Sequence, residues 1–326
     1  MKSYQYYSEV KSKEVEWLWY PYIPYGKITI LQGDPGDGKS TFALNVAAIV
    51  TRGDSLPDGG KIADPQTVIY QCAEDGMEDT IKPRLVAADA NCSRVAFIDG
   101  KDKNITLDDD RIEMALKETG ARLLILDPIQ AFIDSDSNMR SAAKMRVMLS
   151  RLADIAKRYQ CAVLLIGHMT KAEHGKSLYR GLGSIDIAAL ARSVLMITRD
   201  EHVPEIRYMI PVKSSLAPEG SAIGFMLTAD HGFQWIGKCM VDKKEMTSSV
   251  AERLSKKEKA MNLLELMLSA EDLPSAEVLE RMRRIGIGER TVRSAQKEMG
   301  VHSYRKNNMW YLSHGTEEET TQNMEE

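Results

Sequence analysis

Between residues 26 and about 236, short apolar runs alternate with longer stretches of helical character. Several runs are continuously apolar, which is typical of strands that helices cover on both faces. This order predicts an α/β domain with a mostly parallel central sheet, in which the last two or three closely spaced strands are antiparallel. The predicted helices cover residues 41–50, 76–90, 108–119 and 141–159. The predicted strands cover residues 27–31, 67–72, 95–98, 123–126, 162–166, 194–198, 207–211 and 223–228.

A different pattern begins near residue 255 and predicts a smaller unit. Three helices are expected there, and Gly300 is well placed to end the third. A hairpin follows, with Asn307 and Asn308 at its tip. Three short helices and a hairpin are typical of a winged helix-turn-helix. The first helix is inferred from the spacing of Ala260, Leu263, Leu264, Met267 and Leu268, the others cover residues 275–284 and 289–299, and the hairpin covers residues 304–312.

A phosphate-binding loop lies between the first predicted strand and the first predicted helix. Residues 33–41 read Gly-Asp-Pro-Gly-Asp-Gly-Lys-Ser-Thr, which matches the pattern G-x-x-x-x-G-K-[ST]. Backbone N–H groups of such a loop and of the helix N-terminus point at nucleotide phosphates. Lys39 can reach the β- and γ-phosphates, and the Ser40 hydroxyl can bind Mg²⁺. The predicted ligands are therefore ATP (or GTP) and Mg²⁺, and the predicted nucleotide-binding residues are Gly33, Asp34, Pro35, Gly36, Asp37, Gly38, Lys39, Ser40 and Thr41.

Carboxylates follow two of the buried strands. Asp127 ends the run Leu-Leu-Ile-Leu-Asp and is the predicted Mg²⁺ carboxylate, because ligands bind at the carboxyl ends of strands in open α/β sheets. A strand-end Asp that caps the next turn is the structural alternative. Glu74 follows the strand at 67–72 and is the candidate that orients or deprotonates water, with Asp75 as the adjacent alternative. His168 ends the strand at 162–166 and can sense the γ-phosphate, although a structural role is equally compatible with its position.

The composition excludes some classes of protein and site but does not identify a function. The formal net charge is −4, so nucleic-acid contacts would have to come from local basic patches. The four cysteines are far apart in sequence, which favours free thiols in a reducing compartment over a zinc site. No apolar segment is long enough to span a bilayer, and the N-terminus lacks the apolar region of a signal peptide. We therefore expect a cytoplasmic protein without a membrane partner.

The ordered set of motifs resembles the RecA-like ATPases, in the family that includes the replicative hexameric helicases of small plasmids and related phage and mobile-element ATPases. The resemblance covers residues 16–236. Besides the phosphate loop it rests on residues 17–27, Ala73-Glu-Asp75 with Arg84 downstream, residues 126–132, residues 167–171 and residues 180–192.

The resemblance implies roles for the candidate residues. Glu74 would be the catalytic glutamate, Asp127 the Mg²⁺ carboxylate and His168 the sensor. The active site would lie between subunits of a homo-oligomer, by analogy a hexamer, with a cation of the neighbouring subunit at the γ-phosphate. The candidates for that cation are Arg180, Arg192, Arg207 and Lys213, each of which could instead be an ordinary surface charge. Ser215 stands where related helicases often carry a second cation after Lys213.

Two loops would line the channel of a RecA-like ring and hold single-stranded DNA. The loop at 171–180 suits phosphate contacts through Lys171, His174, Lys176 and Arg180. The loop at 134–141 is acidic and fits less well. Without the resemblance, both are surface loops.

The third helix of the C-terminal unit predicts a second DNA contact. Val292, Ala295 and Met299 would face its core. Segment 289–306 carries five Lys or Arg residues against two Glu. A helix of this polarity can enter the major groove of duplex DNA while the wing contacts phosphates. A winged helix that binds protein, or a lid on the ATPase, is the alternative. The predicted DNA-binding residues here are Arg290, Arg293, Lys297, Arg305 and Lys306.

The sequence thus predicts an N-terminal segment (1–25), a RecA-like ATPase domain (26–237), a linker (238–254), a winged-helix domain (255–313) and an acidic, disordered tail (314–326). The leading hypothesis is a ring-forming DNA-dependent ATPase that translocates on or unwinds DNA of a plasmid, phage or integrated element. One alternative is an ATP-switched initiator, helicase loader or regulator that binds duplex DNA. The other is a scaffold or signalling ATPase whose winged helix binds protein.

Overall fold

The computed structural model describes residues 4–99, 105–133, 142–168, 190–200, 203–240, 256–268, 272–284, 287–306 and 309–313. The chain forms two compact units. Unit 1 contains Met1–Met196 and Pro211–Gly220, and unit 2 contains Ile197–Ile210 and Ser221–Glu326. Unit 2 thus groups the last strands before residue 240 with the C-terminal helices. The boundary at residue 237 in the sequence analysis was inferred only from the pattern of apolar and polar residues.

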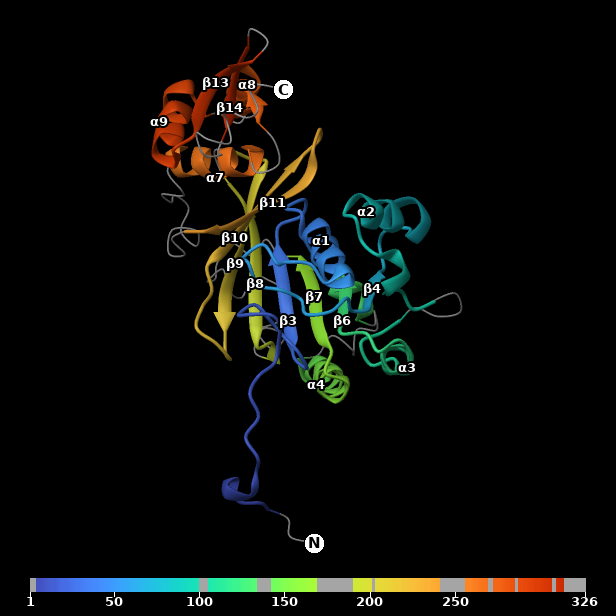
Figure 1. Cartoon of the computed structure of the whole chain (residues 1–326). Coiled ribbons are helices and arrows are strands. Elements are labelled where there is room, and N and C mark those ends of the chain that lie inside the picture. The colour runs from blue at the N-terminus through green and yellow to red at the C-terminus, as the bar shows by residue number, and fades with distance from the viewer. Residues whose placement is uncertain are drawn as a thin grey trace. The chain divides into compact units, whose positions relative to one another are not determined.

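A nine-stranded sheet has the order β11-β10-β9-β8-β3-β7-β6-β4-β5 (Figure 1). Strand β3 pairs in parallel with β7 and β8, β6 pairs in parallel with β7 and β4, and β4 pairs in parallel with β5. Strand β10 pairs antiparallel with β9 and β11. The prediction of a mostly parallel sheet with antiparallel last strands is confirmed. The strands are β3 (Ile28–Gly33), β4 (Val68–Cys72), β5 (Val95–Ala96), β6 (Leu123–Asp127), β7 (Ala162–His168), β8 (Ser193–Arg199), β9 (Ile206–Ser214), β10 (Ala222–Thr228) and β11 (Gly232–Cys239).

Strand β11 was not predicted from the sequence. Its side chains are mostly half-buried, and it lies at the edge of the sheet. Phe233 and Trp235 alternate with glycine and polar residues, so the strand lacks the continuous apolar run that marks the central strands. The last residues of β11, up to Cys239, fall where the linker was expected to begin.

The core of unit 1 shows why the central strands are mostly apolar. Alternate residues of β3, β6 and β7 pack with helices α3 and α4 in one cluster, to which Ile30, Leu126 and Leu165 belong. The intervening residues point to the opposite face of the sheet, because side chains alternate along a strand. Helix α1 packs against β3, β4 and β6. The charged candidate Asp127 and the candidate His168 are instead the last residues of their strands.

The helices of unit 1 agree with their predicted ranges. The stretch predicted at 76–90 is two elements, a π-helical turn η2 (Met77–Ile81) followed by α2 (Lys82–Ala87). Asp109 caps α3 by accepting a hydrogen bond from the Arg111 backbone N–H, and Gly120 ends this helix with a φ of 63°. The helices are α1 (Lys39–Arg52), α3 (Asp110–Thr119) and α4 (Ala142–Tyr159), with short turns η3 (Cys92–Arg94) and η4 (Ile129–Phe132).

The N-terminal segment contributes to the core. A turn, η1 (Tyr7–Glu9), precedes a two-stranded sheet of β1 (Trp17–Trp19) and β2 (Ile23–Pro24). Trp19 is buried and stacks on Phe42 of α1, with ring centroids 6.2 Å apart. These strands were not predicted, because each is only two or three residues long.

In the residues that the structure describes, the C-terminal part of unit 2 contains three helices and a three-stranded sheet of order β12-β14-β13. Helices α8 and α9 have the predicted bounds, and Gly300 ends α9 with a φ of 68°. The interpretation as a winged helix-turn-helix stays a prediction. The hairpin tip, the turn residues 285–286, most of the linker and the acidic tail lie outside the described residues. The elements are α7 (Lys256–Leu268), β12 (Leu273–Pro274), α8 (Ser275–Arg284), α9 (Glu289–Met299), β13 (His302–Lys306) and β14 (Met309–Ser313).

Candidate nucleotide site

Four neighbouring parallel strands end at the same edge of the sheet, where most of the predicted catalytic residues follow them. The order β3-β7-β6-β4 brings the phosphate loop, His168, Asp127 and Glu74 to this edge. Gly33 is in register with His168, and Cys72 is in register with Asp127. The side chain of His168 lies outside the described part of the structure, so its sensor role stays a prediction.

The phosphate loop has a backbone that only glycine adopts readily at two positions. Gly36 and Gly38 have φ values of 80° and 90°. Gly38 immediately precedes Lys39, the first residue of α1, so the loop leads directly into the N-terminus of the helix. The backbone N–H of Asp34 donates to Asp37 Oδ2 over 3.0 Å. In this conformation a carboxylate of the loop uses a donor of the kind that binds phosphate oxygens.

Lys39 is the electrostatic centre of the site. Its side chain is 4% exposed, and Nζ donates to the carbonyl oxygens of Gly33 at 2.9 Å and Asp34 at 2.7 Å. Burial lowers the pKa of Lys39, and the nearby carboxylates oppose this shift. These carboxylates belong to Asp37, Asp127, Asp34 and Glu74. The predicted metal and catalytic carboxylates therefore lie within electrostatic reach of the predicted phosphate-binding lysine.

Asp127 has a partner that sequence reasoning missed. The Tyr70 hydroxyl on β4 donates to Asp127 Oδ2 over 2.6 Å, and both residues are buried. Burial, and then the charge and hydrogen bond of Asp127, raise the pKa of Tyr70 well above its ordinary value. A signal was available, since a tyrosine in a strand that is buried throughout needs a hydrogen-bond partner for its hydroxyl. Identifying Asp127 as that partner required the pairing of β4 with β6.

Glu74 and Asp75 differ in their surroundings. Glu74 is exposed at the edge of the sheet, one residue beyond the Ala73 N–H that donates to the Asp127 carbonyl oxygen over 3.0 Å. Asp75 Oδ2 accepts a hydrogen bond from Arg84 Nη1 at 2.7 Å. The hydrogen bond from Arg84 gives Asp75 a structural role at this edge.

The candidates for a cation acting on a neighbouring subunit have different environments. Arg192 is exposed, whereas Lys213 Nζ donates to the Ala191 carbonyl oxygen over 2.9 Å. Burial, and then Arg192, lower the pKa of Lys213. Arg207 is 7% exposed and donates to the carbonyl oxygens of Glu205 and Leu227. Its role toward a neighbouring subunit stays a prediction. Arg180 lies outside the described residues.

The predicted DNA-binding residues are only partly described. Lys171 and Lys176 fall outside the described ranges. On α9, Val292 and Ala295 are buried as expected, and Arg290, Arg293 and Lys297 are exposed. Glu289 accepts two hydrogen bonds from Arg293, at 2.9 and 2.6 Å, which reduces the charge this arginine offers. On the hairpin, Arg305 is exposed and Lys306 is half-buried.

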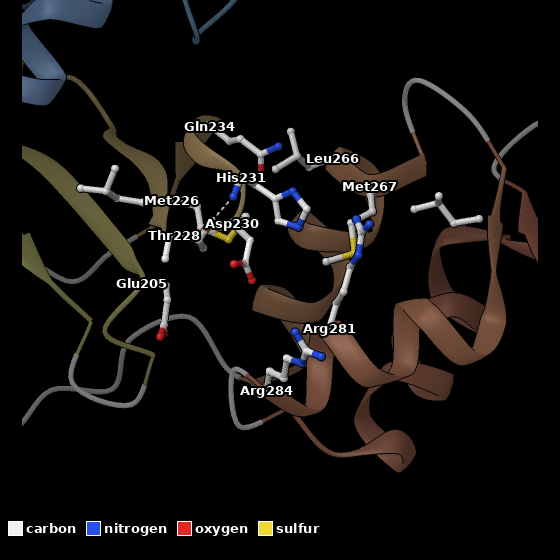
Figure 2. Close-up of a pocket in the computed structure, with 13 residues that line it drawn as sticks. Glu205, Met226, Thr228, Asp230, His231, Gln234, Leu266, Met267, Arg281 and Arg284 are labelled. Atoms are coloured by element: carbon white, nitrogen blue, oxygen red, sulfur yellow. Dashed lines mark hydrogen bonds between the residues drawn. The ribbon is translucent and has the colours of Figure 1, made fainter. Parts of the chain in front are cut away.

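Unit 2 contains a separate cavity of about 500 Å³ (Figure 2). The end of β10, the following turn and β11 line it with residues 226–231 and Gln234. Helices α7 and α8 line it with Leu266, Met267, Arg281 and Arg284. The two arginines are paired with Glu277 and Glu280 of α8. The cavity contains no residue of the predicted nucleotide site. Among the described residues, no helix has the length and apolar character needed to cross a membrane.

Comparison with known proteins places this site in a family. The family described as AAA domain, AAA_25, matches residues 8–174, just over half of the 326-residue chain. The DNA repair protein RadA of Chlamydia pneumoniae is 30% identical over 149 residues, which cover 45% of this chain and 29% of RadA. RadA of Bacillus subtilis (strain 168) is 26% identical over 148 residues, which cover 45% of this chain and 28% of that RadA. This chain thus matches less than a third of the length of these relatives.

A solved structure supports the fold. This structure, described as an ATPase domain, superimposes with a TM-score of 0.50 over 64% of this chain and 84% of that domain, at 15% sequence identity. At this identity the likeness concerns the fold alone.

Proposed function

The chain belongs to the AAA domain family AAA_25 and has a RecA-like P-loop ATPase fold, and from this premise we propose that it is a DNA-dependent ATPase that moves along or unwinds DNA as a ring. One observation carries the proposal. The phosphate loop, Asp127 and Glu74 surround one buried lysine at the carboxyl edge of parallel strands. This arrangement provides a phosphate anchor, a metal carboxylate and a second acid for water.

The residues of the loop suit a triphosphate. The N-terminus of α1 and the glycines at positive φ present backbone donors to an anion. Lys39 exchanges two carbonyl acceptors for phosphate oxygens, which are charged and bind an ammonium more strongly. Asp37 releases the Asp34 N–H at the same time, so phosphate binding and opening of the loop are one event.

The donor set at the loop fits Mg²⁺. Mg²⁺ prefers oxygen ligands and binds through one or two protein groups together with substrate phosphates. The Ser40 hydroxyl and the Asp127 carboxylate are such groups, on α1 and at the end of β6. When bound, the ion neutralises charge that develops on the phosphates. Glu74 then orients the attacking water and accepts its proton. Arg192, Arg180 or Lys213 of a neighbouring subunit completes the site, and His168 senses the γ-phosphate.

The relatives and the candidate channel loop at 171–180 support DNA as the partner. The RadA proteins are named for DNA repair. Lys171 and Lys176 would hold single-stranded DNA in the channel of a hexameric ring, and sequential hydrolysis would move this loop along the strand. A plasmid, phage or integrated element is the replicon that such a motor would serve.

The test is the ATPase rate of the full chain with and without single-stranded DNA, with Lys39→Ala as the blank. Stimulation of at least about tenfold, together with a rise in mass to a ring when ATP and DNA are present, is expected. An unstimulated rate that is still lost in Lys39→Ala would refute the motor and leave an ATPase of another use.

The exposed cations of α9 favour a second candidate, a duplex-bound switch. In this alternative the winged helix binds an origin or regulatory site, and the nucleotide state controls assembly of an initiator or loader. Tight duplex binding without strand displacement would support it. A chain that hydrolyses ATP but responds to neither form of DNA would instead indicate a scaffold that binds protein.

A further inference from the structure

We propose that Tyr70 is a positioning residue that holds the Asp127 carboxylate in the orientation that binds the metal. The inference deepens the proposed function and rests on it, because it assumes that Asp127 binds Mg²⁺. Its basis is the 2.6 Å hydrogen bond from the Tyr70 hydroxyl to Asp127 Oδ2.

The bond is buried and joins two strands. Tyr70 is 1% exposed and Asp127 is 5% exposed, so water does not compete for the carboxylate oxygen. The Ala73 N–H also donates to the Asp127 carbonyl oxygen over 3.0 Å. Backbone and side chain of Asp127 are thus both anchored to β4 and the residue that follows it. A buried carboxylate held by a hydrogen-bond donor keeps one rotamer, which leaves Oδ1 as the oxygen available to an ion.

The geometry explains why the residue is a tyrosine. Tyr70 is in register with Ile125, two residues before Asp127 on the paired strand. Two residues of a strand span about 6.6 Å, so a donor at this position must reach that far along the sheet. A tyrosine extends a hydroxyl over such a distance while its ring fills apolar space, and phenylalanine fills the space without the donor.

The bond also keeps Asp127 apart from Lys39. Asp127 is among the charges that act on Lys39, so its freed carboxylate would turn toward the ammonium. That ion pair would occupy the metal carboxylate and the phosphate lysine together. Tyr70 holds Oδ2 on β4, and Lys39 donates to the loop carbonyls instead. The tyrosine therefore keeps two ligand-binding groups separately available.

Unit 2 offers a matched control. The Tyr208 hydroxyl donates to Asp200 Oδ2 over 3.1 Å, and these residues are 0% and 2% exposed. Neither is a candidate site residue. Tyr208→Phe removes the same kind of buried phenol–carboxylate bond and reproduces the loss of stability without touching the metal site.

The experiment measures binding rather than turnover. Mn²⁺ affinity is determined by electron paramagnetic resonance with saturating ADP, and nucleotide affinity is determined separately in EDTA, for the full wild-type chain, Tyr70→Phe and Tyr208→Phe. We expect Tyr70→Phe to weaken Mn²⁺ binding by about tenfold or more. Nucleotide binding in EDTA should weaken by less, because the freed Asp127 carboxylate competes with phosphate for Lys39 while the backbone donors of the loop stay in place. Tyr208→Phe should bind Mn²⁺ like the wild type. Tyr70→Met, which fills the space with a flexible apolar chain, should reproduce the weakening and serves if the phenylalanine variant does not fold.

Equal Mn²⁺ affinity in wild type and a folded Tyr70 variant overturns the inference and leaves the proposed function standing. A wild type that binds no Mn²⁺ with nucleotide overturns the proposed site, and this inference with it. Equal weakening in Tyr70→Phe and Tyr208→Phe overturns the positioning role in favour of general destabilisation.

Discussion

The carboxyl edge of the parallel strands and the outer face of α9 both carry charged residues, but they hold them in different ways. At the edge, Lys39 and Asp127 are 4% and 5% exposed, and each is fixed by hydrogen bonds of 2.6 to 2.9 Å. On α9, Arg290 and Lys297 are exposed to solvent, and Arg293 pairs with Glu289 of its own helix. One region is organised before a ligand arrives, and the other provides charge at a surface.

This difference determines how strongly a substitution in each region should affect function. Burial in a low dielectric makes each charge interaction strong and each loss costly. Exposed charges are screened by salt and contribute modestly one at a time. Substitutions at the edge should therefore abolish a function, whereas substitutions on α9 should reduce an affinity in proportion to the charges removed.

Lys39→Ala should have the largest effect. It removes the cation of the phosphate site, so we expect kcat/KM for ATP to fall by about a thousandfold or more. The cost of the two lost hydrogen bonds is partly offset, because burial lowers the pKa of Lys39 and so makes its charge unfavourable in the free protein. The measurement is steady-state ATPase with thermal unfolding as a check. Lys117→Ala, an exposed lysine of α3, is the matched control. A folded Lys39→Ala variant with near-normal turnover would contradict the proposed site.

Glu74→Gln and Asp75→Asn should separate the two adjacent acids. The first removes the proposed base and should lower kcat by about a hundredfold, with little change in ATP affinity. The second removes the exposed pair with Arg84, which is worth about 1 kcal/mol or less, and should leave kcat within about threefold. Single-turnover hydrolysis and fluorescent-nucleotide binding distinguish the outcomes. A larger loss of kcat in Asp75→Asn would reverse the assignment.

Sequence reasoning predicted the central sheet because burial on both faces imposes a distinct pattern. Four apolar residues before Asp127 marked both β6 and the carboxylate at its end. Helices α8 and α9 have the predicted bounds, and Gly300 ends α9 as expected. Local chemistry is sufficient for such features.

The features that were missed depend on contacts between distant segments. Tyr70 and Asp127 are 57 residues apart, and only the pairing of β4 with β6 brings them together. Strand β12 forms because the distant strand β14 supplies its partner. Strands β1 and β2 pair locally with each other, but two or three residues carry no period that the sequence would reveal. Burial of Arg207 likewise follows from packing, which its sequence context did not indicate.

The double variant Arg290→Ala, Lys297→Ala should weaken binding to duplex DNA by about tenfold and lower the salt slope by about two, if each residue contacts one phosphate. Arg293→Ala should matter less, because Glu289 already neutralises this side chain. Fluorescence anisotropy at several salt concentrations measures both quantities. If Arg293→Ala were the more damaging change, the ion pair would have to open on binding, and the contrast between organised and surface charge would fail on α9.

A substitution of Tyr304 tests whether the C-terminal part of unit 2 also contains an organised buried group. It has the smallest expected effect. Its hydroxyl donates to Asp272 Oδ2 over 2.8 Å, and burial together with this bond raises the pKa of Tyr304 to about 12. An unfolded tyrosine titrates near pH 10, at about its unperturbed pKa. The stabilisation is therefore complete below pH 10 and is lost as the pH rises toward 12.

Tyr304→Phe should thus lower the unfolding free energy of this unit by about 1 kcal/mol at neutral pH. The difference from wild type should shrink between pH 10 and 12, because ionisation of the unfolded wild-type tyrosine favours unfolding there. Denaturant unfolding of both proteins across this range isolates the tyrosine, since the lysines that titrate nearby are common to both. A difference that stays constant to pH 12 would mean that Tyr304 stabilises the protein through the packing of its ring and not through its hydrogen bond to Asp272. Tyr304 would then not be an organised polar group of the kind found at the nucleotide edge.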